Sequence, residues 1–403
     1  MKTEKKPLSI YIHIPFCLRK CLYCDFLSAP ATEENREKYL NALLQEMNRF
    51  CENHPLQNYE VISVFFGGGT PSLMKAGQVQ RILDKIYRHF DVREDVEISL
   101  ECNPKTADLS KLQGYYGAGV NRLSIGLQSA DNQELLRLGR LHSYEEFLET
   151  YEFARKTGFQ NINIDLMAAI PGQTIHSWRN TLSKVLELEP EHISAYQLIV
   201  EEGTPFFEMY GDSQKNKAGY HGKYASVYAE LPDEDTEREM YYLTKELLEQ
   251  HEYYRYEISN YSKKGYECRH NISYWTGVDY IGFGLGASSY FEGRRYHCVR
   301  DLQKYCRLCR TGANKIYEEI QLLSRKERME EFMFLGLRMI QGVSSREFLD
   351  RFGVDIQEIY RPVLDRMESL GLLIFDKENE RVYLTDRGLD VANYVMSDFL
   401  LDD

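Results

Sequence analysis

Three cysteines near the N-terminus are the residues with the clearest capacity for chemistry. Cys17, Cys21 and Cys24 follow an apolar, β-branched run with the spacing CxxxCxxC. This spacing lets one short loop bring three thiolates to a single small centre, and soft sulfur ligands select zinc, copper(I) or an iron–sulfur cluster. A structural zinc needs a fourth ligand, but the next cysteine, Cys51, lies in a stretch with helical character. Three thiolates on a four-iron cluster would leave one iron open to an exchangeable ligand.

Six short β-branched runs, separated by longer amphipathic stretches, form the frame that must position this loop. The predicted strands are 8–14, 60–66, 95–101, 121–127, 161–167 and 192–199. Predicted helices between them include 33–50, 75–89, 143–157 and 174–188. Such alternation predicts a parallel sheet with helical crossovers. Unusual residues stand at the C-terminal end of each strand, where α/β barrels and open α/β sheets carry their sites. Contributions from six strands favour one closed or nearly closed rim.

Glycines and polar residues at these strand ends are candidate ligand contacts. Gly68, Gly69 and Thr70 follow the second strand, where glycines let the backbone approach a ligand and present N–H groups to it. A tight strand-to-helix turn would explain them equally well, and they lack the spacing of a dinucleotide or P-loop motif, so phosphate binding is not indicated.

Glu101, Gln128 and Asp165 end the third, fourth and fifth strands. Burying an unpaired carboxylate is costly, so these side chains either form structural ion pairs with Arg122 or Arg140 or line a ligand site. Their position beside a cluster loop favours the ligand site.

The cysteine spacing, with the aromatic Tyr23 before the third cysteine, resembles the radical S-adenosylmethionine (SAM) superfamily. This resemblance implies a partial (β/α)6 barrel and a four-iron four-sulfur cluster on Cys17, Cys21 and Cys24. It also implies that SAM binds the open iron and that one electron from the reduced cluster cleaves it to a 5′-deoxyadenosyl radical.

Nearly the whole chain resembles the family of oxygen-independent coproporphyrinogen oxidases, whose members bind a second SAM. The supporting strings are LSIGLQS, LGRLH and IDLMAAIPGQT. The resemblance implies contacts to the cluster-bound SAM from Tyr11, Gly68 and Glu101. It implies contacts to the second SAM from Tyr23, Gly69, Thr70, Gln128, Arg140 and Asp165.

The chain departs from the oxidases at two points. Phe26 stands where they have a fourth cysteine, and the cluster loop begins at residue 17, without the N-terminal extension that helps to close their active site. Both departures argue against decarboxylation. Instead, residues 270–275 read HNISYW, an imidazole flanked by Tyr and Trp that could bind haem. This string resembles the HNxxYW motif of the HemW subgroup of haem chaperones, and we expect His270 to contact haem.

Three domains are predicted: a barrel over 1–200, a barrel extension over 201–323 and a small C-terminal domain over 324–403. Residues 203–240, with Gly203, Gly211, Gly219 and the acidic run 233–235, are expected to form an exposed excursion before a helix over 241–252. The last domain has predicted helices at 328–339, 345–352 and 357–370 and strands at 372–376 and 381–384, a winged-helix-like α+β order. It holds 17 acidic and 11 basic residues, so we expect a lid or docking role rather than DNA binding.

The composition of the chain indicates which classes of binding partner and which cellular location to expect. The 403 residues carry a net charge of −13 and no long basic block, which disfavours nucleic acid. No apolar run approaches a membrane span and no signal peptide is evident, so a cytoplasmic protein with reduced thiols is expected. Cys306 and Cys309 form a CxxC without a second pair, which indicates metal binding only weakly.

The sequence thus predicts a haem chaperone that binds a 4Fe–4S cluster, SAM and haem and passes haem to an unidentified acceptor protein. An electron donor for the cluster is implied. The alternatives are radical decarboxylation of coproporphyrinogen III and SAM-dependent radical methyl transfer.

Overall fold

Twelve strands form one continuous sheet in the computed structural model, which describes residues 5–211, 222–312 and 315–401. Residues 212–221 of the expected excursion, including Gly219, and residues 402 and 403 of the expected C-terminal domain lie outside these ranges. The central strands are β1 (Lys6–Ile14), β2 (Tyr59–Gly68), β3 (Val92–Cys102), β4 (Arg122–Gln128), β5 (Ile162–Ala168) and β6 (His192–Gln197). They lie side by side in chain order and all run parallel, so the predicted partial (β/α)6 barrel is confirmed.

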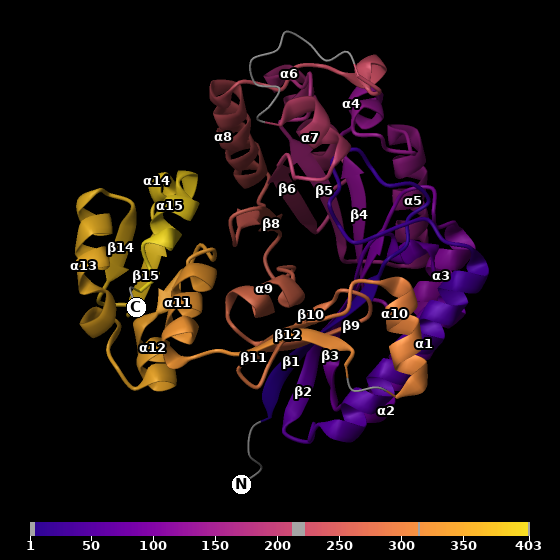
Figure 1. Cartoon of the computed structure of the whole chain (residues 1–403). Coiled ribbons are helices and arrows are strands. Elements are labelled where there is room, and N and C mark those ends of the chain that lie inside the picture. The colour runs from indigo at the N-terminus through magenta and orange to yellow at the C-terminus, as the bar shows by residue number, and fades with distance from the viewer. Residues whose placement is uncertain (1–4, 212–221, 313–314, 402–403) are drawn as a thin grey trace.

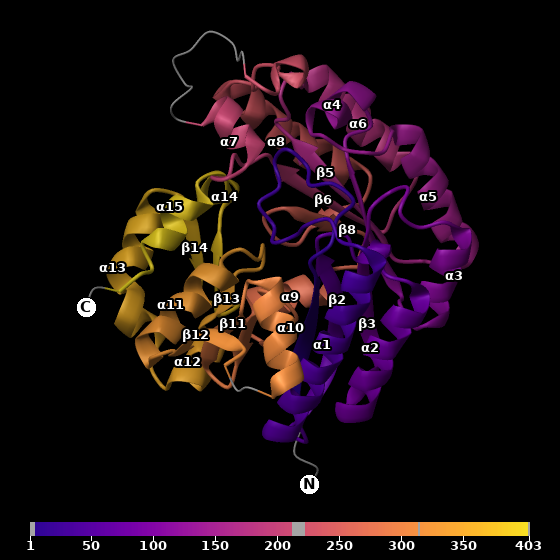
Figure 2. The ribbon, with the colours of Figure 1, turned by 45° about the vertical axis from the view of Figure 1, so that its right-hand side comes forward.

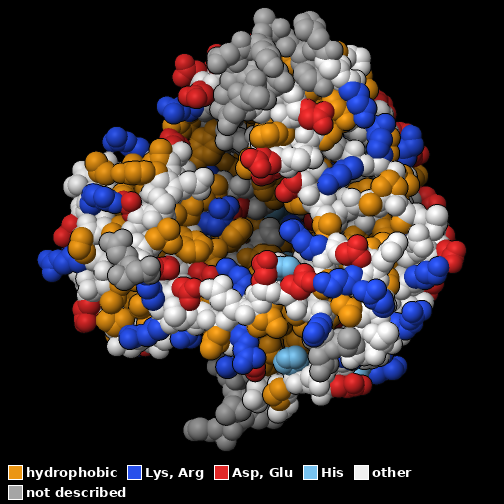
Figure 3. All heavy atoms as spheres, in the orientation of Figure 1, with side chains coloured by type: hydrophobic (Ala, Val, Ile, Leu, Met, Phe, Trp, Pro, Cys, Tyr) orange, Lys and Arg blue, Asp and Glu red, His pale blue; other side chains and the backbone are white. Residues whose placement is uncertain are grey.

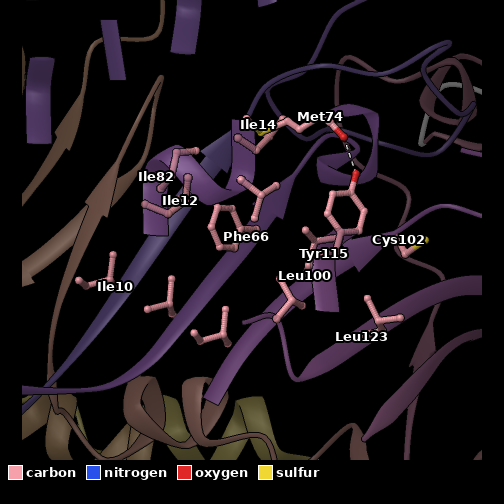
Figure 4. Packing of buried hydrophobic residues seen from close by; sticks show 14 of the residues in the cluster. Ile10, Ile12, Ile14, Phe66, Met74, Ile82, Leu100, Cys102, Tyr115 and Leu123 are labelled. Atoms are coloured by element: carbon pink, nitrogen blue, oxygen red, sulfur yellow. Dashed lines mark hydrogen bonds between the residues drawn. The ribbon is translucent and has the colours of Figure 1, made fainter. Parts of the chain in front are cut away.

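Helices cover the outer face of this curved sheet, as Figures 1 and 2 show. They are α1 (Glu33–Asn53), α2 (Ala76–His89), α3 (Leu109–Gly117), α4 (Asn132–Arg137), α5 (Tyr144–Thr157) and α6 (Ile175–Leu186). Alternate residues of β1, such as Ile10 and Ile12, are fully buried beneath them, beside Phe66 and Leu100 of the next strands (Figure 4). This apolar layer makes the barrel wall rigid, because close-packed side chains leave little room for movement.

The inner face of the barrel is polar. Successive side chains of a strand point to opposite faces, so the residues between the buried isoleucines of β1 point inward. Ser9 of β1 accepts a hydrogen bond from Ser63 of β2 at 2.8 Å and donates one to Ser273 at 2.8 Å. Burial of such groups is favourable only because they hydrogen-bond one another.

Further strands extend the sheet at both edges. On one side β9 (Asp279–Phe283) pairs parallel with β1 and continues into antiparallel β10 (Ser288–Phe291), β11 (Arg294–Cys298) and β12 (Tyr317–Leu322). On the other side β8 (Asn260–Ser262) and β7 (Tyr254–Arg255) follow β6. Helix α9 (Arg269–Trp275) packs against β2, and α10 (Leu302–Thr311) packs against α1. Within the described residues the two edge strands do not pair, so the barrel stays open.

The expectation of an exposed excursion over 203–240 was wrong for part of that segment. Helix α7 (Pro205–Tyr210) buries Phe206 and Met209 against Leu138 and Ile170. Helix α8 (Glu234–Gln250) begins well before the predicted residue 241 because the Asp233 side chain accepts a hydrogen bond from the backbone N–H of Thr236. The acidic run is therefore the cap and first turn of a helix, where negative charge is favourable.

The C-terminal unit has a hydrophobic core of its own. It contains α11 (Arg325–Gly336), β13 (Val343–Ser344), α12 (Ser345–Phe352), α13 (Ile356–Ser369), β14 (Leu373–Asp376), β15 (Arg381–Leu384), α14 (Asp386–Asp390) and α15 (Ala392–Ser397). The winged-helix-like order is confirmed, with β13 as an additional strand beside β15. The division of the chain at residues 200 and 323 stays a prediction. The surface is hollowed between this unit and the barrel (Figure 3). No helix in the described ranges is long and apolar enough to cross a membrane.

Candidate cofactor site at the barrel rim

A cavity of about 410 Å³ opens where the parallel strands end. Its lining includes eleven of the residues singled out from the sequence: Cys17, Cys21, Tyr23, Cys24, Gly68, Gly69, Thr70, Glu101, Gln128, Arg140 and Asp165. These residues come from the loop after β1 and from the ends of β2, β3, β4 and β5, with Arg140 in the segment after α4. The fold therefore gathers at one rim what the sequence spreads over about 150 positions.

Hydrogen bonds hold the cysteine loop near its start and in its middle. Near its start, the backbone N–H of Cys17 donates to the Ala29 carbonyl at 3.2 Å, which closes the loop on itself. In its middle, the backbone N–H of Leu22 donates to the Leu138 carbonyl at 3.0 Å, and the Arg19 side chain donates to the Gly139 carbonyl at 2.9 Å. These bonds fix the direction in which the three thiols face.

Close packing explains the glycines at the end of β2 and directly after it. A Cβ on Gly69 would lie 2.7 Å from the backbone oxygen of Phe16, and a Cβ on Gly68 would lie 2.5 Å from the ring of His13. Gly68 also has a φ of +110°, which other residues adopt only with strain. The run thus lets the end of β2 lie directly against the start of the cysteine loop. Its Gly68 N–H donates to a carboxylate oxygen of Glu101 at 3.2 Å.

The thiols fit an iron–sulfur cluster better than a single metal ion. No group of three or more ligands in the described residues converges on one ion, whereas a four-iron cluster takes each thiolate on a different iron. Two hydrogen-bond donors point at the sulfurs: Thr70 Oγ1 lies 3.4 Å from Cys17 Sγ, and Arg140 Nη1 lies 3.7 Å from Cys21 Sγ. Hydrogen bonds to the sulfurs are one of the means by which proteins tune such clusters. Burial raises the pKa of Cys24 to about 11 in the absence of metal.

Glu101 and Asp165 give the cavity a concentrated acidic wall. Burial, followed by the charge of Asp165, raises the pKa of Glu101 to about 8. Burial also raises the pKa of Asp165, although Asn163 and Ser124 oppose this by donating hydrogen bonds at 2.8 and 3.0 Å. Within the described residues neither carboxylate forms a direct salt bridge with Arg122 or Arg140, as a structural ion pair would require, although the charge of Arg122 lowers the pKa of both. Such a wall favours a cationic ligand.

Arg140 links the cysteine loop to the strand ends. Its Nη2 donates to the Asn103 side chain and to the Gly126 carbonyl, both at 2.5 Å, while its buried Nε has no partner among the described residues. Beside it, burial raises the pKa of Tyr23, and Arg140 opposes that shift. Gln128 adopts a left-handed φ of +73°, a strained conformation that often marks functional sites.

Tyr11 and His270 lie outside this cavity, in a smaller inner chamber of about 170 Å³ within the barrel. The two spaces adjoin, since Glu101, Ser124, Asp165 and Tyr196 line both. Tyr11 Oη lies 3.2 Å from His13 Nδ1, and burial raises the pKa of Tyr11. The structure thus brings Tyr11 near Glu101 but separates His270 from the cysteine loop, and the predicted contacts of Tyr11 and Glu101 to SAM stay a prediction.

His270 is 1% exposed, and both of its ring nitrogens are engaged. Nδ1 lies 2.9 Å from Ser63 Oγ, and Nε2 lies 2.9 Å from the hydroxyl of Tyr274. Because Ser63 donates its proton to Ser9, Nδ1 is the donor to Ser63 and Nε2 accepts from Tyr274. Burial lowers the pKa of His270 to about 3, which agrees with a neutral ring. An iron ligand at Nε2 would have to displace Tyr274, and the predicted haem contact of His270 stays a prediction.

Some cavity residues were missed by sequence reasoning. Asn103, which accepts from Arg140, stands two positions after Glu101 and directly after β3, so strand periodicity continued by one residue could have indicated it. Tyr196 and Met167 line the cavity from β6 and β5. The pair Cys306 and Cys309 lies on α10, with Cys309 buried, and burial raises the pKa of both thiols. They do not belong to a cluster of metal ligands in the described residues.

Comparison with known proteins agrees with this geometry. Residues 11–185 match the profile of the Radical SAM superfamily, and residues 323–391 match the HemN C-terminal domain. The solved structure of coproporphyrinogen III oxidase (HemN) from Escherichia coli, described as a radical SAM enzyme, superposes with a TM-score of 0.82 at 21% identity. That superposition covers 99% of this chain and 91% of the oxidase. The fold and the rim site therefore define a radical SAM protein, a class that implies a 4Fe–4S cluster and SAM as cofactors.

Relatives in sequence show to which family of radical SAM proteins the chain belongs. The heme chaperone HemW of Bacillus subtilis is 36% identical over 97% of this chain and 99% of its own length. The heme chaperone HemW of Lactococcus lactis is 34% identical over 99% of both chains, and that of Escherichia coli is 34% identical over 91% of this chain and 92% of its own. The chain belongs to the HemW family of heme chaperones.

Proposed function

We propose that this protein is a haem chaperone that holds a 4Fe–4S cluster and SAM at the barrel rim, binds haem and transfers it to an acceptor protein. The observation that carries the proposal is the convergence of Cys17, Cys21 and Cys24 on a cavity that Glu101 and Asp165 also line. Family membership supports the haem cargo. A cytoplasmic location and an external electron donor belong to the same proposal.

Within this proposal the chain's own residues hold and position the cofactors. Cys17, Cys21 and Cys24 would ligate three irons, and a bound, reduced cluster supplies the electron that cleaves SAM. Thr70 and Arg140 donate hydrogen bonds to the thiolate sulfurs. Tyr11, Gly68 and Glu101 would contact the SAM on the cluster. Tyr23, Gly69, Thr70, Gln128, Arg140 and Asp165 would contact the second SAM.

The carboxyl groups of Glu101 and Asp165 make the cavity favourable for the positively charged groups of SAM. The sulfonium and ammonium groups of SAM are cations, and a cation within a few ångströms stabilises an ionised carboxylate. Glu101, which holds its proton up to a pH of about 8 in the cofactor-free chain, would release it when such a ligand binds. Asp165 is already oriented toward the cavity by its hydrogen bonds from Asn163 and Ser124.

An anaerobic titration with haem, followed by the Soret band, tests the function as a whole. The cluster-reconstituted chain is expected to saturate near one haem per chain and to pass haem to an apo-acceptor protein. Cys21→Ala is expected to lose the cluster and the formation of 5′-deoxyadenosine, whereas Cys306→Ala, a partly exposed thiol on α10, keeps both.

The outcome also separates the alternatives. Absence of saturable haem binding would overturn the chaperone. If the chain decarboxylated coproporphyrinogen III, the oxidase would replace the chaperone as the proposed function. If it formed S-adenosylhomocysteine together with a methylated product, the methyltransferase would replace it. His270→Ala belongs to the same series, because it asks whether that histidine contributes to haem binding.

A further inference from the structure

Helix α9 places the HNxxYW motif between two cavities. His270 and Tyr274 are four positions apart and share the helix face that lines the inner chamber. Trp275 lies on a different face and lines another cavity, of about 310 Å³, to which Tyr274 also contributes. Since the imidazole is enclosed in the barrel, the outer cavity is the part of this motif that a large ligand can reach.

This outer cavity, named here the α9 cavity, lies between the barrel and the C-terminal unit. Strands β9, β10 and β11 and helix α9 form one side, while α11, α12 and β13 form the other. Both ribbon views show α9 beside α11 (Figures 1 and 2). Aromatic rings are prominent in the lining: Tyr274, Trp275, Tyr280, Tyr290 and Phe332. Flat rings of this kind favour a flat, apolar ligand.

The charges of the α9 cavity are unusual for a protein with a net charge of −13. Four arginines and two glutamates line it. Arg295 pairs with Glu331 at 2.7 Å, and Arg351 pairs with Glu347 at 2.5 Å, so these four side chains neutralise one another.

The other two guanidinium groups have no acidic partner within the described residues. Arg328 Nε donates only to the Ser324 carbonyl at 3.4 Å, and Arg381 Nη1 donates to the Gly342 carbonyl at 3.3 Å. Arginine forms strong, bidentate bonds with carboxylates. The cavity thus combines an aromatic lining with two available cations, which matches a planar apolar ring that carries two carboxylates.

We propose that the α9 cavity binds the porphyrin of haem, with Trp275 and Tyr274 against the ring and Arg328 and Arg381 on the two propionates. His270 is then a positioning residue, whose Nε2 holds the hydroxyl of Tyr274 at 2.9 Å. This inference rests on the proposed haem chaperone function. The cavity is at the small end of the usual range for ligand sites, so part of the haem would stay outside and accessible to an acceptor.

The test compares haemin with its dimethyl ester, in which both carboxylates are blocked, as ligands of the full-length chain. Wild type is expected to bind haemin about tenfold or more tightly than the ester, because the ester cannot form charge-assisted bonds. The double variant Arg328→Gln with Arg381→Gln is expected to lose this preference. A matched double variant, Arg346→Gln with Arg361→Gln, removes two exposed arginines of the same unit outside the cavity and is expected to keep it.

Two further variants test whether Trp275 packs against the porphyrin and whether His270 binds the haem iron. Trp275→Ala is expected to weaken haemin and ester alike. His270→Ala is expected to weaken binding while the position of the Soret band stays unchanged. A preference that persists in the Arg328/Arg381 variant, or a Soret shift in His270→Ala, would overturn the assignment. If wild type bound neither ligand in a saturable manner, the haem chaperone function itself would fail, which is a distinguishable result.

Discussion

Replacing Glu101 by Gln should stabilise the metal-free chain at alkaline pH and leave it unchanged in acid. In the folded protein the pKa of Glu101 is about 8, against an ordinary value of 4.5. A carboxyl group with a raised pKa favours the folded state fully below its ordinary pKa, and this contribution is lost as pH rises through the folded value. The cause is burial, followed by the charge of Asp165, which together outweigh the hydrogen bond from Gly68 and the opposing charge of Arg122.

The shift sets the size of the effect. At ~1.4 kcal/mol per pKa unit, the change from 4.5 to about 8 corresponds to a loss on the order of 5 kcal/mol above pH 8. Glutamine is neutral at every pH and can still accept the hydrogen bond from the Gly68 N–H. The variant is therefore expected to match wild type near pH 4.5 and to gain progressively up to pH 9. Local opening of the cavity to water makes the stated value an upper limit.

Denaturant unfolding of the two proteins from pH 5 to pH 9 measures the difference in the free energy of unfolding. Glu94→Gln, which removes an exposed carboxylate of the same strand, serves as the control for the loss of one negative charge. If the difference between Glu101→Gln and wild type were constant across this range, Glu101 would not be the buried, proton-holding group described above. A cationic ligand in the cavity would then need another partner.

Three other perturbations follow from single contacts. Gly69→Ala should lower the cluster content and destabilise the chain by about 1–3 kcal/mol, because its Cβ would meet a backbone oxygen at 2.7 Å. Gly77→Ala, with open space around it, should be harmless, and equal cluster content in both variants would contradict this explanation. Arg140→Gln removes a positively charged hydrogen-bond donor from Cys21, so the reduction potential of the cluster should fall, as measured by an EPR-monitored redox titration. An unchanged potential would show that this contact is absent in the holoprotein. Burial raises the pKa of Glu46 to about 7, so the free energy of unfolding of wild type should fall by about 3 kcal/mol as the pH rises from 4.5 to 8. Thermal unfolding of Glu46→Gln should lack this pH dependence.

Regular elements were predictable because each has a local cause. The apolar period of β1 and its neighbours, and the capped, amphipathic helices between them, predict the barrel strands to within a few residues. Strands β9 to β12 were not predicted. Strand β9 joins the sheet by pairing with β1, more than 260 positions away in the chain, and β10 to β12 extend the sheet from it by antiparallel pairing. Helix α8 was placed too late because the capping role of Asp233 was overlooked in a run of acidic residues.

The rim site was accessible from the sequence for a geometric reason. Parallel strands in chain order bring their C-terminal ends to one edge, so residues at equivalent positions of different strands meet there. The inner chamber could also have been foreseen. Polar residues alternate with apolar ones along the strands, as in Asn163 and Asp165 of β5 and Ser194 and Tyr196 of β6, and all four line that chamber.

Which way the HNxxYW motif faces could not be read from residue types alone. Imidazole, phenol and indole are all competent haem contacts, but a helix turns by about 100° per residue, so positions 270 and 274 share a face that position 275 does not. Helical periodicity over 269–275 would therefore have been enough to predict that His270 and Trp275 lie on different faces of the helix. Only the packing of α9 against β2 and α11 determines that the histidine enters the barrel while the tryptophan faces the C-terminal unit. Because Tyr274 lines both spaces, and the inner chamber shares Glu101 with the rim cavity, the inner chamber adjoins both the α9 cavity and the rim cavity.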